Sequence, residues 1–135
     1  MPVPRKRIAP ATPDASLLYW RFEEGLSVAH LKHHPGNLES LHVLGHALTR
    51  QGMHAQALIC DEALVRLVPR DPVARYNLAC SFSNLNRIDE SLAALAEAFR
   101  LGYRGLRHLL RDPDLANVRR DPRFRALIER ARPRV

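Results

Sequence analysis

The sequence predicts an all-α protein, and three observations carry that prediction. Of the 135 residues, 46% are hydrophobic and only 6% are aromatic, a composition that suits helices packed by Leu and Ala better than a β-sandwich or barrel. Apolar residues recur at helical spacing, as Leu41, Leu44 and Leu48 illustrate. The chain also resembles itself at a shift of 34 residues, which indicates a structural unit that stacks on a copy of itself.

The shift places small residues on small ones and large residues on large ones. The aligned pairs are Pro35 with Pro69, Asn37 with Asp71, Leu44 with Leu78, Gly45 with Ala79, Leu48 with Phe82, Leu58 with Leu92 and Leu64 with Ala98. The apolar spacing predicts two short helices in each period. Between them stand Gly52 and Asn86, residues that suit the left-handed conformation in which a chain leaves a helix. Each period is therefore expected to form a tight antiparallel hairpin.

A small polar residue followed by proline marks four expected helix starts, because the polar side chain can cap the helix and proline suits its first position. These dipeptides are Thr12-Pro13, Asp71-Pro72, Asp112-Pro113 and Asp121-Pro122. Together with the apolar spacing they predict helices near residues 13–33, 38–51, 54–68, 72–85, 88–101, 104–111, 113–118 and 122–131.

On these residues the chain resembles the tetratricopeptide-repeat (TPR) family. The first repeat matches the family's order of large and small residues at Leu41, Leu44-Gly45, Leu48, Ala57 and Pro69. The second repeat matches it at Leu78-Ala79, Phe82, Ser91, Leu95 and Ala98. The tract Tyr76-Asn77-Leu78-Ala79-Cys80 is also close to the sequence typical of the family. The segment from Asp112 to Phe124 looks like the ending common in bacterial members. Departures from the family pattern are Arg75, Asp61 and Tyr103.

The resemblance implies a short right-handed α-solenoid of TPR-like hairpins. Its repeats would span about 38–71 and 72–105, within a single domain over 13–135 that follows a flexible basic, Pro-rich tail at 1–12. Repeat arrays need atypical ends to close their cores, so we expect helix 13–33 and residues 104–131 to act as caps. The expected buried cap residues are Leu17, Leu18, Trp20, Phe22, Leu109, Leu115, Phe124 and Leu127.

The positive charge is concentrated near the C-terminus. The net charge is +7, yet residues 1–99 hold ten Lys or Arg against ten Asp or Glu, whereas residues 100–135 hold eleven Arg against four acids. Such an end attracts acidic peptides, nucleic acid or anionic lipid by the same long-range field, so charge alone does not choose among them. The arginines could equally serve only solubility.

Cysteine usage and the N-terminal stretch predict a soluble, cytoplasmic protein without a membrane anchor. Cys60 and Cys80 are too few for a disulfide framework and lack the spacing of metal ligands. Residues 1–13 are basic and Pro-rich, with no apolar run of the kind that a signal peptide or membrane segment needs.

Neither a metal site nor an active site is predicted. His42 and His46 share one helix face at i and i+4, and Glu39 is near in sequence, but no residue stands out as a further ligand. The sequence also lacks a serine elbow and a phosphate-binding Gly-rich loop. We therefore expect no cofactor and no enzymatic activity.

The resemblance implies a concave groove lined by the first helix of each repeat. The expected peptide-binding residues are Glu39, His42, His46, Tyr76, Asn77, Cys80, Arg107 and Arg111. Five of them, His42, His46, Asn77, Arg107 and Arg111, fall by spacing where co-chaperones of this family hold the terminal carboxylates of chaperone tails; the two histidines depart in type. Paired arginines could bind carboxylates bidentately.

The sequence thus favours a protein-protein interaction module, an adaptor or chaperone-like scaffold that binds an acidic or C-terminal peptide. One alternative is binding of nucleic acid or another polyanion by the segment from Arg100 to Arg134, where Tyr103 and Phe124 are the only aromatics and Phe124 is expected to be buried. A second alternative is a self-associating scaffold.

Overall fold

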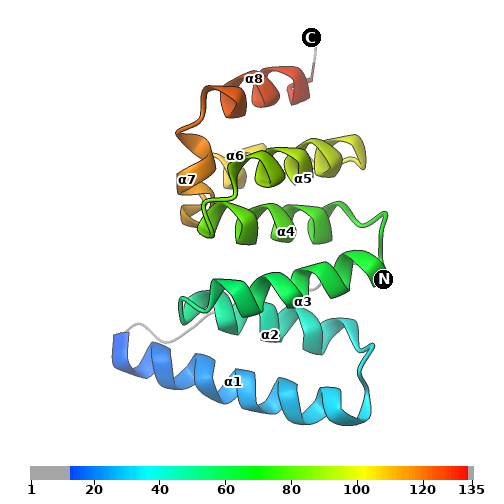
Figure 1. The fold of residues 1–135 in the computed structure, drawn as a ribbon, viewed down its shortest axis with the longest axis vertical. Coiled ribbons are helices and arrows are strands. Elements are labelled where there is room, and N and C mark those ends of the chain that lie inside the picture. Colours follow the sequence, from blue (N-terminus) through cyan, green and yellow to red (C-terminus); the bar gives the residue numbers. More distant parts are fainter. Residues whose placement is uncertain (1–12, 134–135) are drawn as a thin grey trace. The chain divides into compact units, whose positions relative to one another are not determined.

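The computed structural model describes residues 13–133, and every regular element in that range is a helix (Figure 1). The expected all-α class is therefore confirmed. The chain divides into two compact units, residues 1–69 and residues 70–135, which are described one at a time. The tail at residues 1–12 and the expected cap Thr12 lie outside the described residues.

The first unit contains three helices, α1 (Pro13–His33), α2 (Leu38–Arg50) and α3 (His54–Leu67). Helix α2 begins where the Asn37 side chain accepts a hydrogen bond from the Ser40 backbone N–H at 2.9 Å, which satisfies a donor that has no partner inside the helix. The hairpin between α2 and α3 turns at Gly52, whose φ is +77°. This is the left-handed conformation expected at that position.

Helices α2 and α3 approach closely along their small residues. Leu48, Ala57 and Cys60 form a buried cluster against which Leu44 and Met53 pack. A Cβ added at Gly45 would lie 3.3 Å from the Cys60 Cβ and 3.4 Å from an Asp61 carboxylate oxygen. Since the gap leaves so little room for a side chain, Gly45 lets the two helices pack at this distance.

Helix α1 packs on α2 through an unexpected face. Trp20 is buried as predicted, and its ring meets that of His46 edge-on, with 4.7 Å between centroids. Glu23 and Ser27, which follow at helical spacing, are buried beside it. The residues turned outward are Leu17, Leu18, Phe22, Leu26 and Val28, all at least 41% exposed. The prediction that Leu17, Leu18 and Phe22 are buried cap residues is therefore wrong.

The second unit begins with the hairpin of α4 (Pro72–Asn84) and α5 (Ile88–Arg100). Asp71 caps α4 by accepting hydrogen bonds from the backbone N–H groups of Val73 and Ala74 at 2.8 and 3.3 Å, and Asn86 makes the turn with a φ of 58°. The Ser91 hydroxyl donates to the Ala79 carbonyl at 2.8 Å. This buried contact joins the two helices where their small residues meet.

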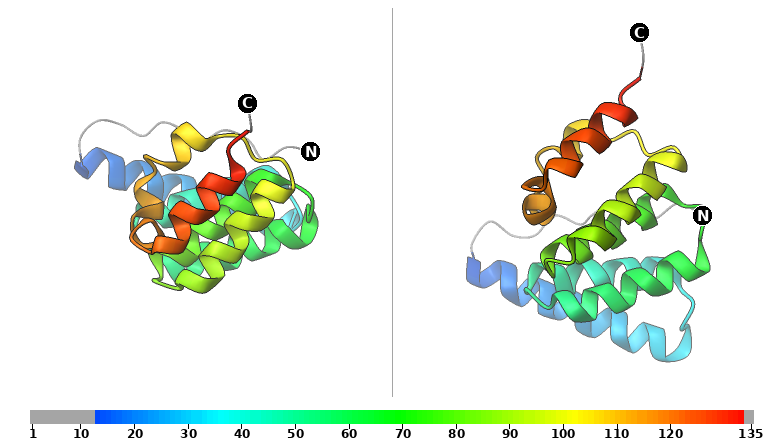
Figure 2. Two further views of the ribbon diagram at one scale, coloured as in Figure 1. Left: turned by 90° about the horizontal axis from the view of Figure 1, so that it is seen from above. Right: turned by 45° about the horizontal axis from the view of Figure 1, so that its top comes forward.

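Four short elements complete the second unit: α6 (Leu106–Leu109), the 3₁₀ turn η1 (Pro113–Leu115), α7 (Ala116–Arg119) and α8 (Pro122–Ala131). Segment η1 and helix α7 contact α4, while α8 contacts α5 (Figure 2). Leu109 and Leu115 are fully buried and Phe124 is 3% exposed, so these three expected cap residues are confirmed. Leu127 is only half-buried.

Most expected helices end within a residue of the observed ones, but two differ. The helix expected over 104–111 has regular turns only at 106–109, and the one expected over 113–118 is divided into η1 and α7. Among the described residues, no helix combines the length and the apolar character needed to cross a membrane.

Candidate functional site

Asp112 attaches the segment around α6 and η1 to helix α4. Its side chain is 2% exposed and accepts a hydrogen bond from the Tyr76 hydroxyl of α4. The same carboxylate accepts from the Asp114 backbone N–H at 3.0 Å, which caps η1. The His108 Nε2 lies 3.2 Å and the Cys80 Sγ 3.9 Å from one of its oxygens. Asp112 thus links side chains of α4 to the backbone of the C-terminal segment.

The Tyr76 ring is held between this carboxylate and a second tyrosine. Tyr76 and Tyr103 stack nearly parallel, with 4.7 Å between centroids and 5° between planes. Burial, with the nearby Cys80 and Asp112 adding to it, raises the pKa of Tyr76 far above its ordinary value and that of Tyr103 to about 12. Both phenols therefore remain protonated at neutral pH, and the Tyr76 hydroxyl is available as a donor to Asp112.

Further contacts fix the backbone on both sides of Asp112. The Arg119 Nη2 donates to the carbonyl oxygens of Leu109 at 3.1 Å and Asp112 at 2.7 Å. The Ser83 hydroxyl of α4 accepts from the Val118 backbone N–H at 3.1 Å, and the Asn117 amide donates to the Ser83 carbonyl at 3.0 Å. The segment that carries α6 is consequently tied down by buried polar groups, although α6 itself is a single turn.

Arg107 and Arg111 project from this fixed segment; we call them the arginine pair. Both are exposed, and neither side chain forms a hydrogen bond or ion pair with another described residue. Some other arginines of the unit are engaged, such as Arg87 with Glu90 at 2.7 Å and Arg123 with Asp89 at 2.8 Å. Two arginines four residues apart in the sequence, with no internal partner, are suited to bind carboxylates or phosphates.

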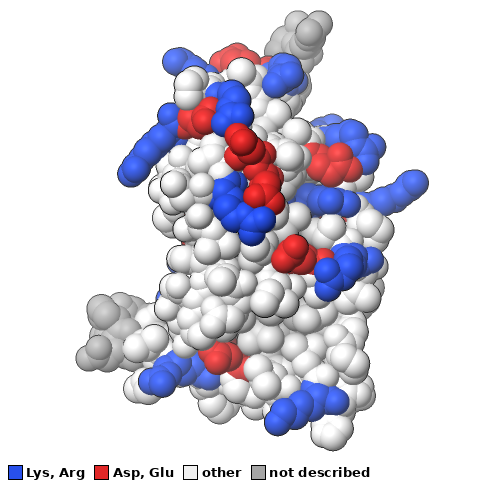
Figure 3. All heavy atoms as spheres, in the orientation of Figure 1, with Lys and Arg blue, Asp and Glu red and all other residues white. Residues whose placement is uncertain are grey.

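Acidic side chains interrupt the basic surface elsewhere in the second unit. Figure 3 shows Asp and Glu next to Arg over α5 and α8. Of the four acids after residue 99, however, Asp112 and Asp114 are buried and Asp121 forms an ion pair with Arg123 at 2.9 Å. The hydrogen bonds from Arg123 lower the pKa of Asp121 to about 2. The unpaired positive charge of the second unit therefore lies on particular arginines and is not spread over its whole surface.

The structure places several predicted groove residues away from open surface. Tyr76 is 3% and Cys80 6% exposed, because the segment around Asp112 covers that side of α4. In the first unit His42 is 6% exposed, and His46 is half-buried against Trp20. These four side chains therefore present little surface to a ligand, and their roles in binding stay predictions. Asn77 is half-buried.

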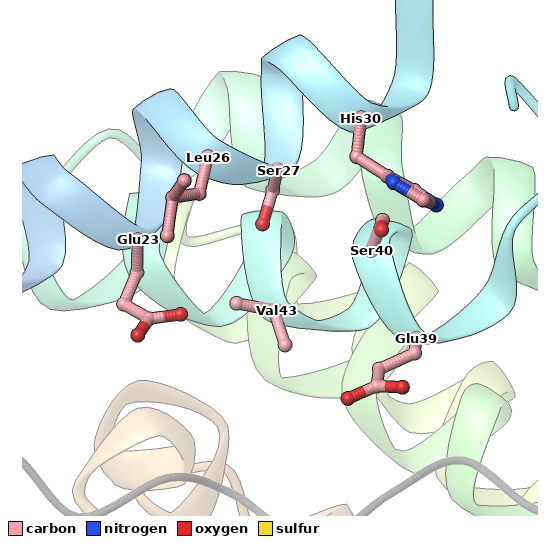
Figure 4. Close-up of a pocket in the computed structure, with 7 residues that line it drawn as sticks. All are labelled: Glu23, Leu26, Ser27, His30, Glu39, Ser40 and Val43. Carbon is pink, nitrogen blue, oxygen red and sulfur yellow. The ribbon is translucent and has the colours of Figure 1, made fainter. Parts of the chain in front are cut away.

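Glu39 lines a different feature, a pocket between α1 and α2 with a volume of about 250 Å³ (Figure 4). Glu23 also lines it, together with Ser27, His30 and Ser40. Two carboxylates make this part of the first unit unfavourable for an acidic peptide. Among the described residues, no group of three or more His, Cys, Asp or Glu is arranged to hold a metal ion.

Sequence reasoning missed the contacts of Asp112, His108 and Arg119, which hold the segment that carries the arginine pair. The Asp112-Pro113 dipeptide did mark Asp112 as a helix cap, which the hydrogen bond to the Asp114 N–H confirms. Its bond to Tyr76, 36 residues earlier in the chain, leaves no local signal in the sequence.

Comparison with known proteins gives one partial similarity and no family assignment. No family model matches the chain, and no solved structure matches it. A curated relative, a chloroplastic protein of Arabidopsis thaliana, is 33% identical over 88 residues, which cover 63% of this chain and 26% of the relative. The chain thus corresponds to about a quarter of that protein's length.

Proposed function

We propose that the chain is a TPR-type interaction module whose second unit binds an acidic segment of a partner protein through the arginine pair. The observation that carries the proposal is that Arg107 and Arg111 are exposed, have no partner among the described residues, and extend from a segment pinned by Asp112 and Arg119. Side chains on a fixed backbone lose less entropy on binding than side chains on a mobile loop.

The assignment to TPR-type repeats is supported by equivalent local structure in the hairpins α2–α3 and α4–α5. Asn37 and Asp71 cap the first helices at positions 34 residues apart. Gly52 and Asn86, also 34 apart, make both turns with positive φ. A repeated sequence that builds the same hairpin twice is typical of such arrays.

We further propose that the chain is not an enzyme. A thiol, an imidazole and a carboxylate come together at Cys80, His108 and Asp112, and there the buried Cys80 Sγ faces the carboxylate. A nucleophilic thiol needs access to substrate and a base within hydrogen-bonding reach. The grouping instead serves to hold the C-terminal segment on α4.

Binding of an acidic peptide to paired variants tests the proposal. The probe is a fluorescent 12-residue peptide of alternating Glu and Ser with both ends neutralised, followed by anisotropy at 50 and 200 mM salt. Replacing Arg107 and Arg111 by Ala removes two charge-assisted contacts, so affinity should fall about tenfold, in line with roughly 1.4 kcal/mol per decade. Affinity should also fall with salt.

The matched control is Arg120→Ala with Arg125→Ala. These are two other exposed arginines of the unit without an ion pair to a described residue. This variant has the same net charge, and its affinity should change less than twofold. Equal losses in both variants would contradict a local site. A labelled single-stranded oligonucleotide that binds more tightly than the peptide would instead favour the polyanion alternative. That alternative lacks accessible aromatic rings for base stacking at these two positions, because Phe124 is buried and Tyr103 is stacked on Tyr76.

The outward face of α1 favours a second candidate function, self-association. Leu18, Phe22 and Leu26 lie at successive i+4 positions and are 66%, 62% and 53% exposed. Contiguous exposed apolar side chains are typical of association surfaces. Sedimentation velocity of the wild type and of a Leu18→Gln, Phe22→Gln variant tests it: a concentration-dependent species lost in the variant is expected, and a monomer at all concentrations would contradict it.

A further inference from the structure

A second pocket of the described residues lies wholly within the second unit, between α5 and α8. Its volume is about 380 Å³, within the size range of sites for small ligands. Helix α5 contributes Phe99 and Arg100, the following loop contributes Arg104, and α8 contributes Leu127, Arg130 and Ala131. The two helices are in contact and α8 runs along α5 (Figure 2). Neither member of the arginine pair lines this pocket.

The lining combines an apolar wall with guanidinium groups. Phe99, Leu127 and Ala131 are half-buried, so each keeps part of its apolar surface accessible. Three arginines surround them, and no Asp or Glu is among the described residues that line the pocket. An apolar surface with fixed charged donors at its edge is typical of a site that orients one small, amphipathic group.

Two of the three arginines are available to a ligand. Arg100 already donates from Nε to a Glu97 carboxylate oxygen at 2.8 Å. Arg104 makes only a 3.3 Å contact from Nη1 to the neighbouring Tyr103 carbonyl, and the Arg130 side chain has no partner among the described residues. Both are exposed. Their guanidinium groups can therefore turn toward an anion without breaking an ion pair to a described residue.

The chemistry of the lining side chains selects the ligand. Guanidinium groups are positively charged, donate hydrogen bonds and accept none, so a cationic side chain finds no side-chain acceptor here. A carboxylate matches the donor geometry of Arg. The apolar wall adds the burial of a hydrocarbon group, worth about 25 cal/mol per Å² removed from water. The C-terminal residue of a peptide ending in an apolar side chain carries both groups on adjacent atoms.

We infer that the pocket between α5 and α8 binds the C-terminal apolar residue of a peptide, with its free carboxylate on Arg104 and Arg130 and its side chain against Phe99 and Leu127. The site differs in position and chemistry from the arginine pair. It requires a chain end and one hydrocarbon side chain, whereas the arginine pair requires only acidic side chains. Either site can therefore fail its test without the other.

The test uses the full chain and a neutral hexapeptide, Gly-Ser-Gly-Ser-Gly-Leu, labelled at its N-terminus and followed by fluorescence anisotropy. The free acid should bind at least tenfold more tightly than the C-terminal amide. Replacing the last Leu by Gly should weaken binding at least fivefold. Arg104→Ala with Arg130→Ala should reduce binding of the acid to that of the amide, and circular dichroism of this variant should match the wild type because both side chains are exposed.

The control variant Arg120→Ala with Arg125→Ala carries the same change in net charge, does not alter the pocket lining, and should bind the free acid as the wild type does. Equal binding of acid and amide would overturn the inference, and so would a loss that is the same in the two double variants. Displacement of the peptide by octanoate at equal concentration would assign the pocket to small amphipathic carboxylates and overturn the peptide assignment.

Discussion

Helices α1 and α8 were both expected to cap a core, and they do so in opposite ways. Helix α8 buries Phe124 and Ile128, one turn apart, and exposes Arg123, Arg125 and Arg130. Helix α1 buries Glu23 and Ser27 beside Trp20 and exposes four aliphatic residues and Phe22. Helix α8 thus buries two of its large apolar residues within its own unit, whereas much of the apolar surface of α1 remains in contact with solvent.

The difference shows when an apolar pattern fixes the orientation of a helix. In α8 the large apolar residues fall on one stripe, so only one face can be buried. In α1 the run Leu17-Leu18-Tyr19-Trp20 and Phe22 covers every side of the helix. The contacts with α2 therefore determine which face of α1 is buried. Those contacts include the Trp20–His46 ring pair and a hydrogen bond from the Gln51 amide to Glu24 at 2.9 Å.

Truncating the corresponding aromatics should give the largest difference between the two ends. Phe124→Ala removes a buried ring and should lower the free energy of unfolding by about 3–5 kcal/mol. Phe22→Ala, at a position 62% exposed, should change it by no more than about 0.5 kcal/mol. Urea unfolding followed by circular dichroism measures both. Similar losses would mean that α1 is packed as tightly as α8.

High pH should lower the stability of both units, because each contains a buried group whose pKa is raised. The contrast between α1 and α8 therefore does not extend to this pH dependence. Burial raises the pKa of Cys60 in the first unit from 9.0, and that of Tyr103 in the second from 10.0, to about 12 each. A raised folded-state pKa favours the neutral form in the fold. The stability is therefore full below pH 9 and is lost as pH rises from 9 toward 12, by an amount on the order of a few kcal/mol.

Urea unfolding at unit intervals from pH 8 to pH 11 measures this dependence. Cys60→Ala provides the control, since its curve should fall less steeply above pH 9 than that of the wild type. Parallel curves would show that the Cys60 thiol does not contribute.

A smaller effect is expected from the contact that fixes the arginine pair. The Asp112 carboxylate accepts from the Tyr76 hydroxyl and, with its other oxygen, from the Asp114 N–H. Asp112→Asn leaves one acceptor oxygen for two donors, so the free energy of unfolding should fall by about 1–3 kcal/mol. Asp89→Asn, which alters an exposed ion pair with Arg123, should cost at most about 1 kcal/mol. Equal effects of the two substitutions on urea unfolding would contradict the role of Asp112.

The parts of the fold that the sequence predicted are those with local causes. Caps at Asp71, Asp112 and Asp121 and turns at Gly52 and Asn86 depend on a few neighbouring residues, and they define several of the helix bounds. The face presented by α1 and the burial of His42, Tyr76 and Cys80 depend on elements distant in sequence. Binding roles for Asn77, Arg107 and Arg111 stay predictions.

The most direct test of the proposed function is a ¹⁵N–¹H NMR titration of the full chain with the neutral-ended Glu-Ser peptide. We expect chemical-shift changes at the backbone amides of residues 106–111 and at the Arg107 and Arg111 Nε–H groups, with the amides of α1 unchanged. Shift changes confined to α1 would contradict the proposal. So would the absence of any change at a peptide concentration of about 1 mM, which half-saturates a site with a binding free energy of roughly −4 kcal/mol.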